Sequence, residues 1–332
     1  MKHSLFIFPI LFLFINIFCS SSTKTLTKLT FNYRSEMRIL VQEIASYARS
    51  KKPRFIIIPQ NGHELITKTG TISGNIENNY MGVIDAIARE DLYYGYEKSN
   101  YPTLKSVTDS INEFLNLAKN YGKQILVIDY CNSVAYIDNS FNKNYENNYI
   151  SFVAPNRLLN KIPSYPKKIF NENRKDITSV SGVKNFLYLI NPQKYATLLS
   201  LKRAIARTNY DLIIIDAFFK KKLVTVDKFL RFKQNGKKRL VIAYMSIGEA
   251  EIYRYYWNKT WKKNKPPWIF DENPEWPGNF KVAYWHPLWK SIIYKSPDSY
   301  VKKIITSGFD GVYLDIIDAY EYFESSHKKL KK

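Results

Sequence analysis

Eight short apolar runs, most of them separated by segments with helical spacing, constrain the fold more than any other feature. Near-continuous apolar strands are what a parallel sheet covered on both faces requires. Eight of them predict a closed (β/α)8 barrel, a TIM barrel, with its site at the carboxyl ends of the strands. A doubly wound open sheet is the alternative fold, but no glycine-rich phosphate loop supports it. The predicted strands cover residues 54–58, 83–88, 124–128, 149–154, 185–190, 211–216, 239–249 and 312–314.

The segments between the strands predict one barrel domain over residues 31–326. Apolar residues recur at helical spacing in 36–49 and in 107–120, so we expect helices there. Residues 156–182 are polar and contain prolines, which indicates a connecting loop. The short piece 281–285 is ambiguous.

The N-terminus predicts a secretory signal peptide over residues 1–18, followed by a polar tether over 19–30. A basic start precedes an apolar run from Leu5 to Phe18, which is too short for a comfortable membrane span. Cys19 directly after the run suggests a bacterial lipoprotein, held at the membrane through a lipidated cysteine. Because Phe18 is bulky for that cleavage, a secreted or periplasmic form and a retained signal anchor stay open.

The net charge of +21 permits acidic partners, but the lysines are spread through the chain. No nucleic-acid-reading motif accompanies the charge, so we expect no nucleic-acid partner and explain the lysines by overall composition. Cys131 follows a predicted strand, with no histidine nearby, and reads as a packed free thiol rather than a nucleophile. We expect a monomer.

Two carboxylates at predicted strand ends form the first candidate pair. Asp315 ends the strand at 312–314, and Glu90 ends a strand two places further round a barrel. A glycosidase needs two such groups flanking one bond. The alternatives are a helix cap for Asp315 or Asp318 and a salt bridge for Glu90 to Arg89 or a lysine.

A second acidic cluster follows the strand at 239–249. Gly248 permits a sharp exit from the strand, so Glu249 can turn into the barrel mouth, whereas Glu251 is expected to begin a helix. Either glutamate is an alternative acid/base. All six tryptophans lie between Trp257 and Trp289, and we expect one or two of them to contact a sugar. The four histidines are scattered, so we expect neither a metal site nor a cofactor.

These motifs resemble an extracellular family related to glycoside hydrolase family 114, the endo-α-1,4-polygalactosaminidases. The resemblance covers about residues 29–324. It rests on the Gly-Glu-Ala-Glu segment within 244–257, the Asn-Pro-Glu-Trp-Pro-Gly-Asn segment at 273–279, the stretch 308–322 and the Gln-Asn-Gly segment within 57–62. In the family the Gln-Asn-Gly segment follows the Leu-Asp-Ile one, whereas here the order is reversed, which implies a circular permutation.

The resemblance implies that Asp315 is the nucleophile or charge stabiliser and that Glu90 is the acid/base. It suggests an exported, endo-acting glycoside hydrolase that cleaves an α-linked, possibly galactosamine-containing polysaccharide without a metal. The alternative is a non-catalytic carbohydrate-binding surface lipoprotein. Part of this branch carries a disputed cysteinyl-tRNA synthetase label, which the export signal and missing nucleotide motifs oppose. The other candidate substrate-binding residues are Asp216, Tyr244, Ser246, Glu249, Asn61, Gln60, Asp318 and Tyr130.

Overall fold

The structure is a computed structural model that describes the backbone of residues 31–329 and the side chains up to Ser326. The predicted signal peptide and the whole of the predicted tether lie outside these residues. From Tyr33 onward the described residues form one compact unit. Within the described range, none of the helices combines the length and the apolar character that a membrane crossing would need.

The eight predicted strands are all present, and they form two parallel sheets. The five-stranded sheet has the order β1 (Ile56–Pro59), β13 (Gly311–Asp315), β9 (Leu240–Ser246), β6 (Leu212–Asp216) and β5 (Phe186–Leu189). The three-stranded sheet has the order β2 (Ala86–Glu90), β3 (Gln124–Tyr130) and β4 (Ile150–Ala154). The molecule is therefore an α/β protein with parallel sheets, as predicted.

The two sheets meet at both of their edges. Between β1 and β2, the backbone N–H of Asp85 donates to Ile57 O at 2.9 Å and that of Asn61 donates to Ala88 O at 2.8 Å. Between β4 and β5 the contact is by side chains, with the rings of Phe152 and Phe186 5.7 Å apart, and in the described part of the chain no backbone hydrogen bond joins these two strands. Closure into a barrel therefore stays a prediction.

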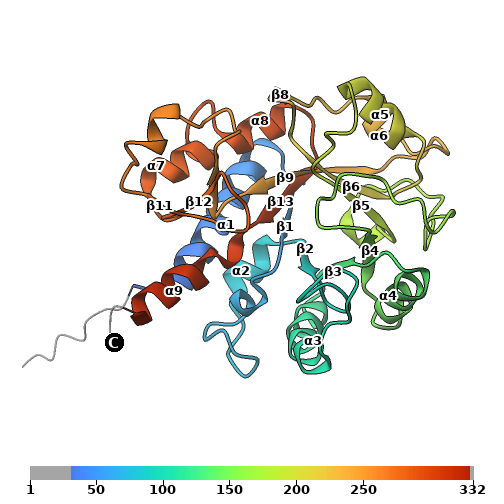
Figure 1. Cartoon of the computed structure of the whole chain (residues 1–332), viewed down its shortest axis with the longest axis horizontal. Helices are drawn as coiled ribbons and strands as arrows, with labels where there is room; N and C mark the ends of the chain where they lie inside the picture. The colour runs from blue at the N-terminus through green and yellow to red at the C-terminus, as the bar shows by residue number, and fades with distance from the viewer. Residues whose placement is uncertain (1–30, 330–332) are drawn as a thin grey trace, which may run out of the picture. The chain divides into compact units, whose positions relative to one another are not determined.

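The first and the last of these strands are neighbours. Ile57 of β1 pairs in parallel with Val312 of β13, and the blue β1 lies beside the red β13 in Figure 1. Two segments more than 250 residues apart in the sequence are thus adjacent strands of one sheet. Helices cover the strands from outside, with α3 and α4 beside β3 and β4 and α8 beside β13. The helices are α1 (Tyr33–Lys51), α2 (Asn78–Val83), α3 (Lys105–Asn120), α4 (Val134–Glu146), α5 (Leu198–Ala206), α6 (Lys228–Arg231), α7 (Pro287–Lys290), α8 (Tyr300–Thr306) and α9 (Tyr320–Lys329).

One predicted strand begins later than its apolar run. We expected a strand from Val83, but Val83 ends α2 and β2 begins at Ala86. The side chain of Asp85 explains the boundary, because its Oδ2 accepts the Ile57 N–H at 2.7 Å and an Arg49 N–H at 2.9 Å. The run is therefore interrupted by a turn that fixes β2 against β1.

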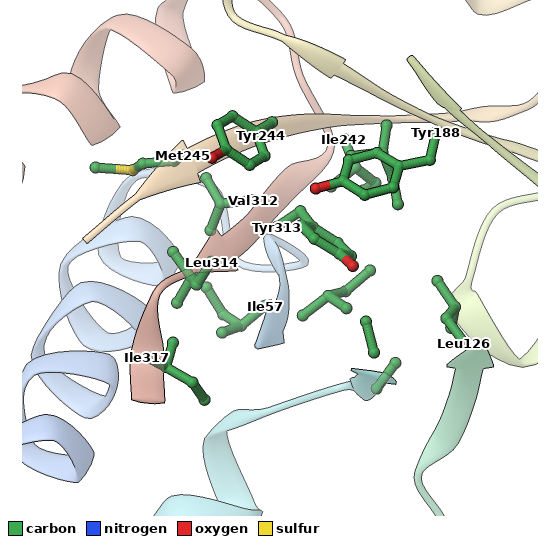
Figure 2. Packing of buried hydrophobic residues seen from close by; sticks show 14 of the residues in the cluster. Ile57, Leu126, Tyr188, Ile242, Tyr244, Met245, Val312, Tyr313, Leu314 and Ile317 are labelled. Carbon is green, nitrogen blue, oxygen red and sulfur yellow. The ribbon is translucent and has the colours of Figure 1, made fainter. Parts of the chain in front are cut away.

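Buried side chains fill the space between the two sheets. Figure 2 shows Tyr188 of β5, Tyr313 of β13 and Leu126 of β3 pointing into this space, and all three are at most 1% exposed. Fully burying one such apolar side chain contributes about 1.5–3 kcal/mol. This burial on both faces explains why the strands have near-continuous apolar sequences.

A small antiparallel sheet, absent from the predictions, follows β9. It has the order β10 (Glu249–Glu251), β12 (Asn279–Val282) and β11 (Ile269–Glu272). The prediction that a helix begins at Glu251 is wrong, because Glu251 pairs with Asn279 in this sheet. The predicted strand 239–249 accordingly ends at Ser246, and the ambiguous piece 281–285 begins inside β12.

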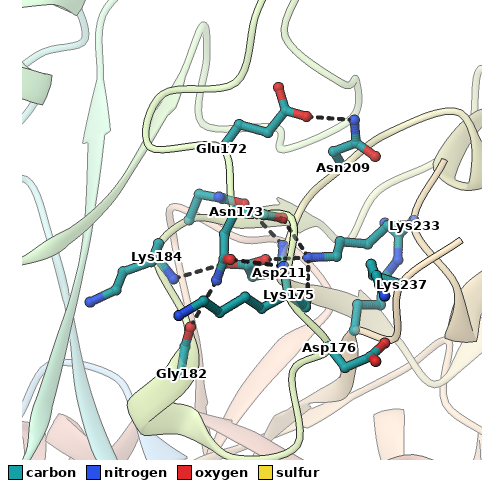
Figure 3. A network of polar contacts seen from close by, with 12 residues as sticks. Glu172, Asn173, Lys175, Asp176, Gly182, Lys184, Asn209, Asp211, Lys233 and Lys237 are labelled. Atoms are coloured by element: carbon teal, nitrogen blue, oxygen red, sulfur yellow. Dashed lines mark hydrogen bonds and ion pairs between the residues drawn. The ribbon is translucent and has the colours of Figure 1, made fainter. Parts of the chain in front are cut away.

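The connection from residue 156 to 182 is a loop, as predicted, apart from a short helical turn at Val180–Gly182. A buried ion pair anchors it beside the amino end of β6 (Figure 3). Lys233 Nζ lies 2.8 Å from Asp211 Oδ1, and both side chains are fully buried. The same ammonium donates to Asn173 O at 2.7 Å and to Lys175 O at 2.8 Å, so the loop is tied to the start of β6.

Candidate active site

A cavity of about 380 Å³ lies at the carboxyl ends of the parallel strands. This is the end where sites occur in parallel α/β folds. Eight of the ten candidate residues line it together with side chains that the sequence did not point to. The eight are Asp315, Glu90, Asp216, Tyr244, Glu249, Asn61, Gln60 and Tyr130.

Asp315 ends β13 and is held by two donors. The Tyr244 hydroxyl donates to its Oδ2 at 2.6 Å, and the N–H of Ile316 donates to its Oδ1 at 2.8 Å. The helical turn that follows, Ile317–Ala319, receives no cap from a side chain. Asp315 is therefore not a helix cap but a carboxylate oriented at the cavity wall.

The residue after Asp315 has a strained backbone. Ile316 has φ 58°, in the left-handed region that a β-branched residue rarely enters. Such a conformation costs about 1–3 kcal/mol and persists only where the surroundings impose it. Here it turns the Ile316 N–H back onto the Asp315 carboxylate.

Glu90 ends β2 and is held in a similar way. Its carboxylate accepts the Gln60 amide at 2.5 Å and the Tyr130 hydroxyl. The Tyr188 hydroxyl in turn donates to Gln60 Oε1 at 3.1 Å, which fixes the orientation of that amide. Among the described residues Glu90 has no ion-pair partner, so the salt-bridge alternative is not observed.

Both carboxyl groups have a raised pKa. Burial, together with the charge of Glu90, raises the pKa of Asp315 well above its usual value. Burial and then the charge of Asp91 raise the pKa of Glu90 to about 7. Two such groups in one cavity lose their protons one at a time, so one carboxylic acid and one carboxylate coexist over a pH interval. An acid beside a base is the arrangement that glycoside hydrolysis needs.

The other acids of the cavity are paired with cations. Lys281 Nζ lies 2.6 Å from Glu249 Oε1. Arg254 Nη1 contacts both Asp216 oxygens at 2.8 Å, and its Nε contacts Glu251 at 2.5 Å. A cation stabilises the ionised form of a carboxylate and makes it a poor proton donor. Glu249 and Glu251 are thus each paired with a cation, whereas Glu90 has no such partner among the described residues.

Two candidate residues lie outside the cavity lining. Ser246 is 1% exposed, and its hydroxyl bonds to Glu249 O at 3.3 Å. Asp318 lines a separate polar cavity of about 540 Å³ together with Arg89 and Glu321. Burial raises the pKa of Asp318, while Lys281 and Arg89 oppose the rise.

Several residues that line the cavity were not identified as site residues from the sequence. Arg157 comes from the loop interpreted only as a connection, pairs with Asp91 at 2.9 Å and lies 4.6 Å above the Tyr130 ring. Of the six tryptophans, Trp276 contributes to the lining and is 44% exposed, whereas Trp268 and Trp289 are buried. No motif marks Arg157, whereas Trp276 is one of the six tryptophans among which one or two sugar contacts were expected. The remaining missed polar and aromatic residues are Tyr188, Asn191, Gln193, Tyr253, Arg254 and Asn279.

Cys131 is a buried free thiol, as predicted, and burial raises its pKa to about 12. In the described part of the chain no three histidine, cysteine or acidic side chains group as metal ligands would.

The second half of the chain is similar in sequence to a known protein family. Residues 186–332 match the model of glycoside-hydrolase family GH114. An uncharacterized protein of Methanocaldococcus jannaschii is 41% identical over 165 residues, which cover 47% of this chain and 45% of the relative. Uncharacterized proteins of Deinococcus radiodurans and Thermotoga maritima are 42% identical over 118 residues and 48% identical over 82 residues. The alignments cover 36% and 24% of these two relatives, so the chain spans less than half the length of each of the three.

Proposed function

We propose that the protein is a glycoside hydrolase of the family 114 type that cleaves an α-linked polysaccharide at internal glycosidic bonds. The observation that carries the proposal is the pair Asp315 and Glu90, two carboxyl groups with raised pKa that line one cavity and have no ion-pair partner among the described residues. The family match over residues 186–332 supports glycoside hydrolysis and includes Asp315. Glu90 lies outside the matched residues, so its role rests on the geometry and on the sequence resemblance.

In the proposed reaction Glu90 gives its proton to the glycosidic oxygen as the bond to the leaving sugar breaks. Asp315 faces the anomeric carbon, either bonding to it or stabilising its positive charge. Water then takes the place of the leaving sugar, and Glu90 accepts its proton. Tyr130 and Gln60 hold Glu90, and Tyr244 and Ile316 hold Asp315.

We propose a closed, circularly permuted (β/α)8 barrel as the scaffold. The pairing of β1 with β13 supports closure, because the first and last strands of a closed barrel are neighbours. The match confined to residues 186–332 supports the permutation, since a collinear comparison finds only one side of a permuted chain. Gln60 and Glu90 would then belong to the part displaced to the front.

The charge of the cavity favours a cationic sugar. Arg254 is shared by Asp216 and Glu251, and Glu249 is paired with Lys281. The pair Asp315 and Glu90 adds a further negative charge, so the catalytic cavity keeps an acidic excess. An amino sugar such as galactosamine suits this field.

We propose that the protein is exported, either secreted or periplasmic or anchored through Cys19, with a signal peptide over 1–18, a tether over 19–30 and one domain over 31–326. We propose that it acts as a monomer on a polysaccharide, without nucleic acid. Each of these points rests on the amino-acid sequence alone.

The proposal is tested by incubating the protein with de-N-acetylated α-1,4-linked galactosamine polymer and separating the products by size. We expect internal cleavage into fragments of several lengths and loss of cleavage in Asp315→Asn. Binding of the polymer without new reducing ends would instead identify a carbohydrate-binding protein.

A further inference from the structure

A second cavity of about 280 Å³ adjoins the catalytic one. The two share part of their walls, including Asn191, Asp216 and Arg254. A glycan held at Asp315 and Glu90 can therefore continue into this space without leaving the cleft. The lining of the second cavity includes strand β7 (Phe218–Phe219) and the turn that connects β7 to β8 (Lys222–Leu223).

Aromatic rings line one side of this cavity. Phe218 and Tyr255 are stacked with ring centroids 5.4 Å apart and an interplanar angle of 28°. Tyr253 lies between the two cavities, lines both and is 50% exposed. Exposed aromatic faces beside a catalytic cleft are suited to contact the apolar face of a sugar ring.

The turn of the β7–β8 hairpin carries two lysines in an unfavourable conformation. Lys220 has φ 46° and Lys221 has φ 69°. A two-residue turn with both φ positive favours Asn-Gly, and each other residue costs about 1–2 kcal/mol. Backbone strain of this kind concentrates at functional sites. The hairpin therefore carries two lysines at positions where other residues would make the turn more stable.

The two lysines change the charge along the cleft. Within residues 31–329 neither forms an ion pair with a carboxylate. Lys220 Nζ donates one hydrogen bond, to Ala196 O at 3.0 Å, so the ammonium has donors to spare. Asp216 is the one acidic side chain among the described residues that line this cavity, and it is bound by Arg254. The electrostatic potential is therefore negative near Asp315 and Glu90 but positive near the hairpin.

We propose that the second cavity binds an acidic sugar unit, a uronic acid, next to the unit that is cleaved. Its ring would pack against Phe218 and Tyr255, and its carboxylate would bind Lys220 and Lys221. The inference rests on the proposed function because it names the neighbour of the hydrolysed unit. The substrate would then be a mixed polymer with basic and acidic sugars, rather than galactosamine alone.

The test replaces the turn by its conformationally preferred sequence, in the double variant Lys220→Asn with Lys221→Gly. The full chain is titrated with D-galacturonate and with D-galactose by ligand-observed NMR. We expect the wild type to bind galacturonate at least 10-fold more tightly than galactose, and the variant to lose this preference. Because the new turn relieves backbone strain, the melting temperature of the variant should be equal to or higher than that of the wild type. This measurement separates a loss of binding from a loss of folding.

The matched control is Lys262→Asn with Lys263→Asn, which removes two exposed lysines outside both cavities. It should bind galacturonate as the wild type does. The inference is overturned if the wild type shows no preference, if the turn variant keeps it, or if sodium acetate displaces galacturonate at equal concentration. Binding is measured without turnover, so galacturonate preference without hydrolysis would contradict the proposed function alone, and hydrolysis without the preference would contradict this inference alone.

Discussion

Gly248 lies against the backbone of Ile316, so closely that a Cβ on the glycine would stand 2.2 Å from the Ile316 carbonyl oxygen and 2.7 Å from the Cβ of Ala319. The glycine after β9 is thus needed for close packing against the turn after β13. That turn carries the N–H that orients Asp315. The contact explains how two neighbouring strands jointly fix one carboxylate.

Gly248→Ala is expected to reduce activity at least 10-fold, because the added methyl group must push the Ile316 turn and thereby displace Asp315. Overpacking of this kind costs about 1–3 kcal/mol, so the melting temperature should also fall. Turnover and thermal unfolding measure the two effects. The control is Gly82→Ala, whose Cβ would meet nothing within 4 Å. Equal activity in both alanine variants would contradict the role of the contact.

Glu90→Gln is expected to stabilise the fold at alkaline pH. The folded-state pKa of Glu90 is raised to about 7, above that of the unfolded chain, so the stability it contributes is full below about pH 4.5 and is lost as the pH rises through about 7. At 1.36 kcal/mol per pKa unit the loss is at most about 3 kcal/mol. Melting temperatures of the variant and the wild type should therefore diverge from pH 5 to pH 8.5. A constant difference would show that Glu90 has an ordinary pKa.

Tyr130→Phe is expected to shift the pH profile of the reaction. The Tyr130 hydroxyl donates to the Glu90 carboxylate and lowers the pKa of that group. Without the donor the pKa rises, so Glu90 keeps its proton to higher pH and the alkaline limb of kcat/KM moves up. Rates from pH 5 to pH 9 measure the shift, with Tyr96→Phe at an exposed tyrosine as the control. An unchanged limb would mean that Glu90 is not the proton donor.

Lys233→Ala is expected to destabilise the protein by about 3–5 kcal/mol, because it leaves the Asp211 charge buried without its partner. It also frees the carbonyl groups of Asn173 and Lys175, which tie the 156–182 loop to the strands. Chemical denaturation gives the free energy of unfolding, and Lys237→Ala at an exposed lysine is the control. A loss below about 1 kcal/mol would mean that the pair does not anchor the loop.

The strands could be predicted from the sequence because they are buried on both faces, which leaves an uninterrupted apolar run. Strand β3 is typical, with six of its seven residues buried. The same logic placed Asp315 and Glu90, since a polar residue that ends such a run lies at the sheet edge where sites form.

The features that were missed depend on partners far away in the sequence. Glu251 looked like a helix start because its strand partner, Asn279, comes 28 residues later. The neutralisation of Asp216 by Arg254, 38 residues away, is likewise invisible to any local pattern. Short strands such as β10 and the β7–β8 hairpin have no periodicity long enough to detect. Tertiary pairing, rather than local propensity, defines this side of the site.

The most direct test of the account is the rate of reducing-end release from α-1,4-linked galactosamine oligomers by the wild type, Asp315→Asn and Glu90→Gln, with Glu113→Gln, at an exposed glutamate outside the cavity, as the matched control. We predict rates at least 100-fold lower for the two carboxyl variants, unchanged oligomer binding in both, and a rate close to wild type for the control. Wild-type rates in both carboxyl variants would contradict the assignment of the pair.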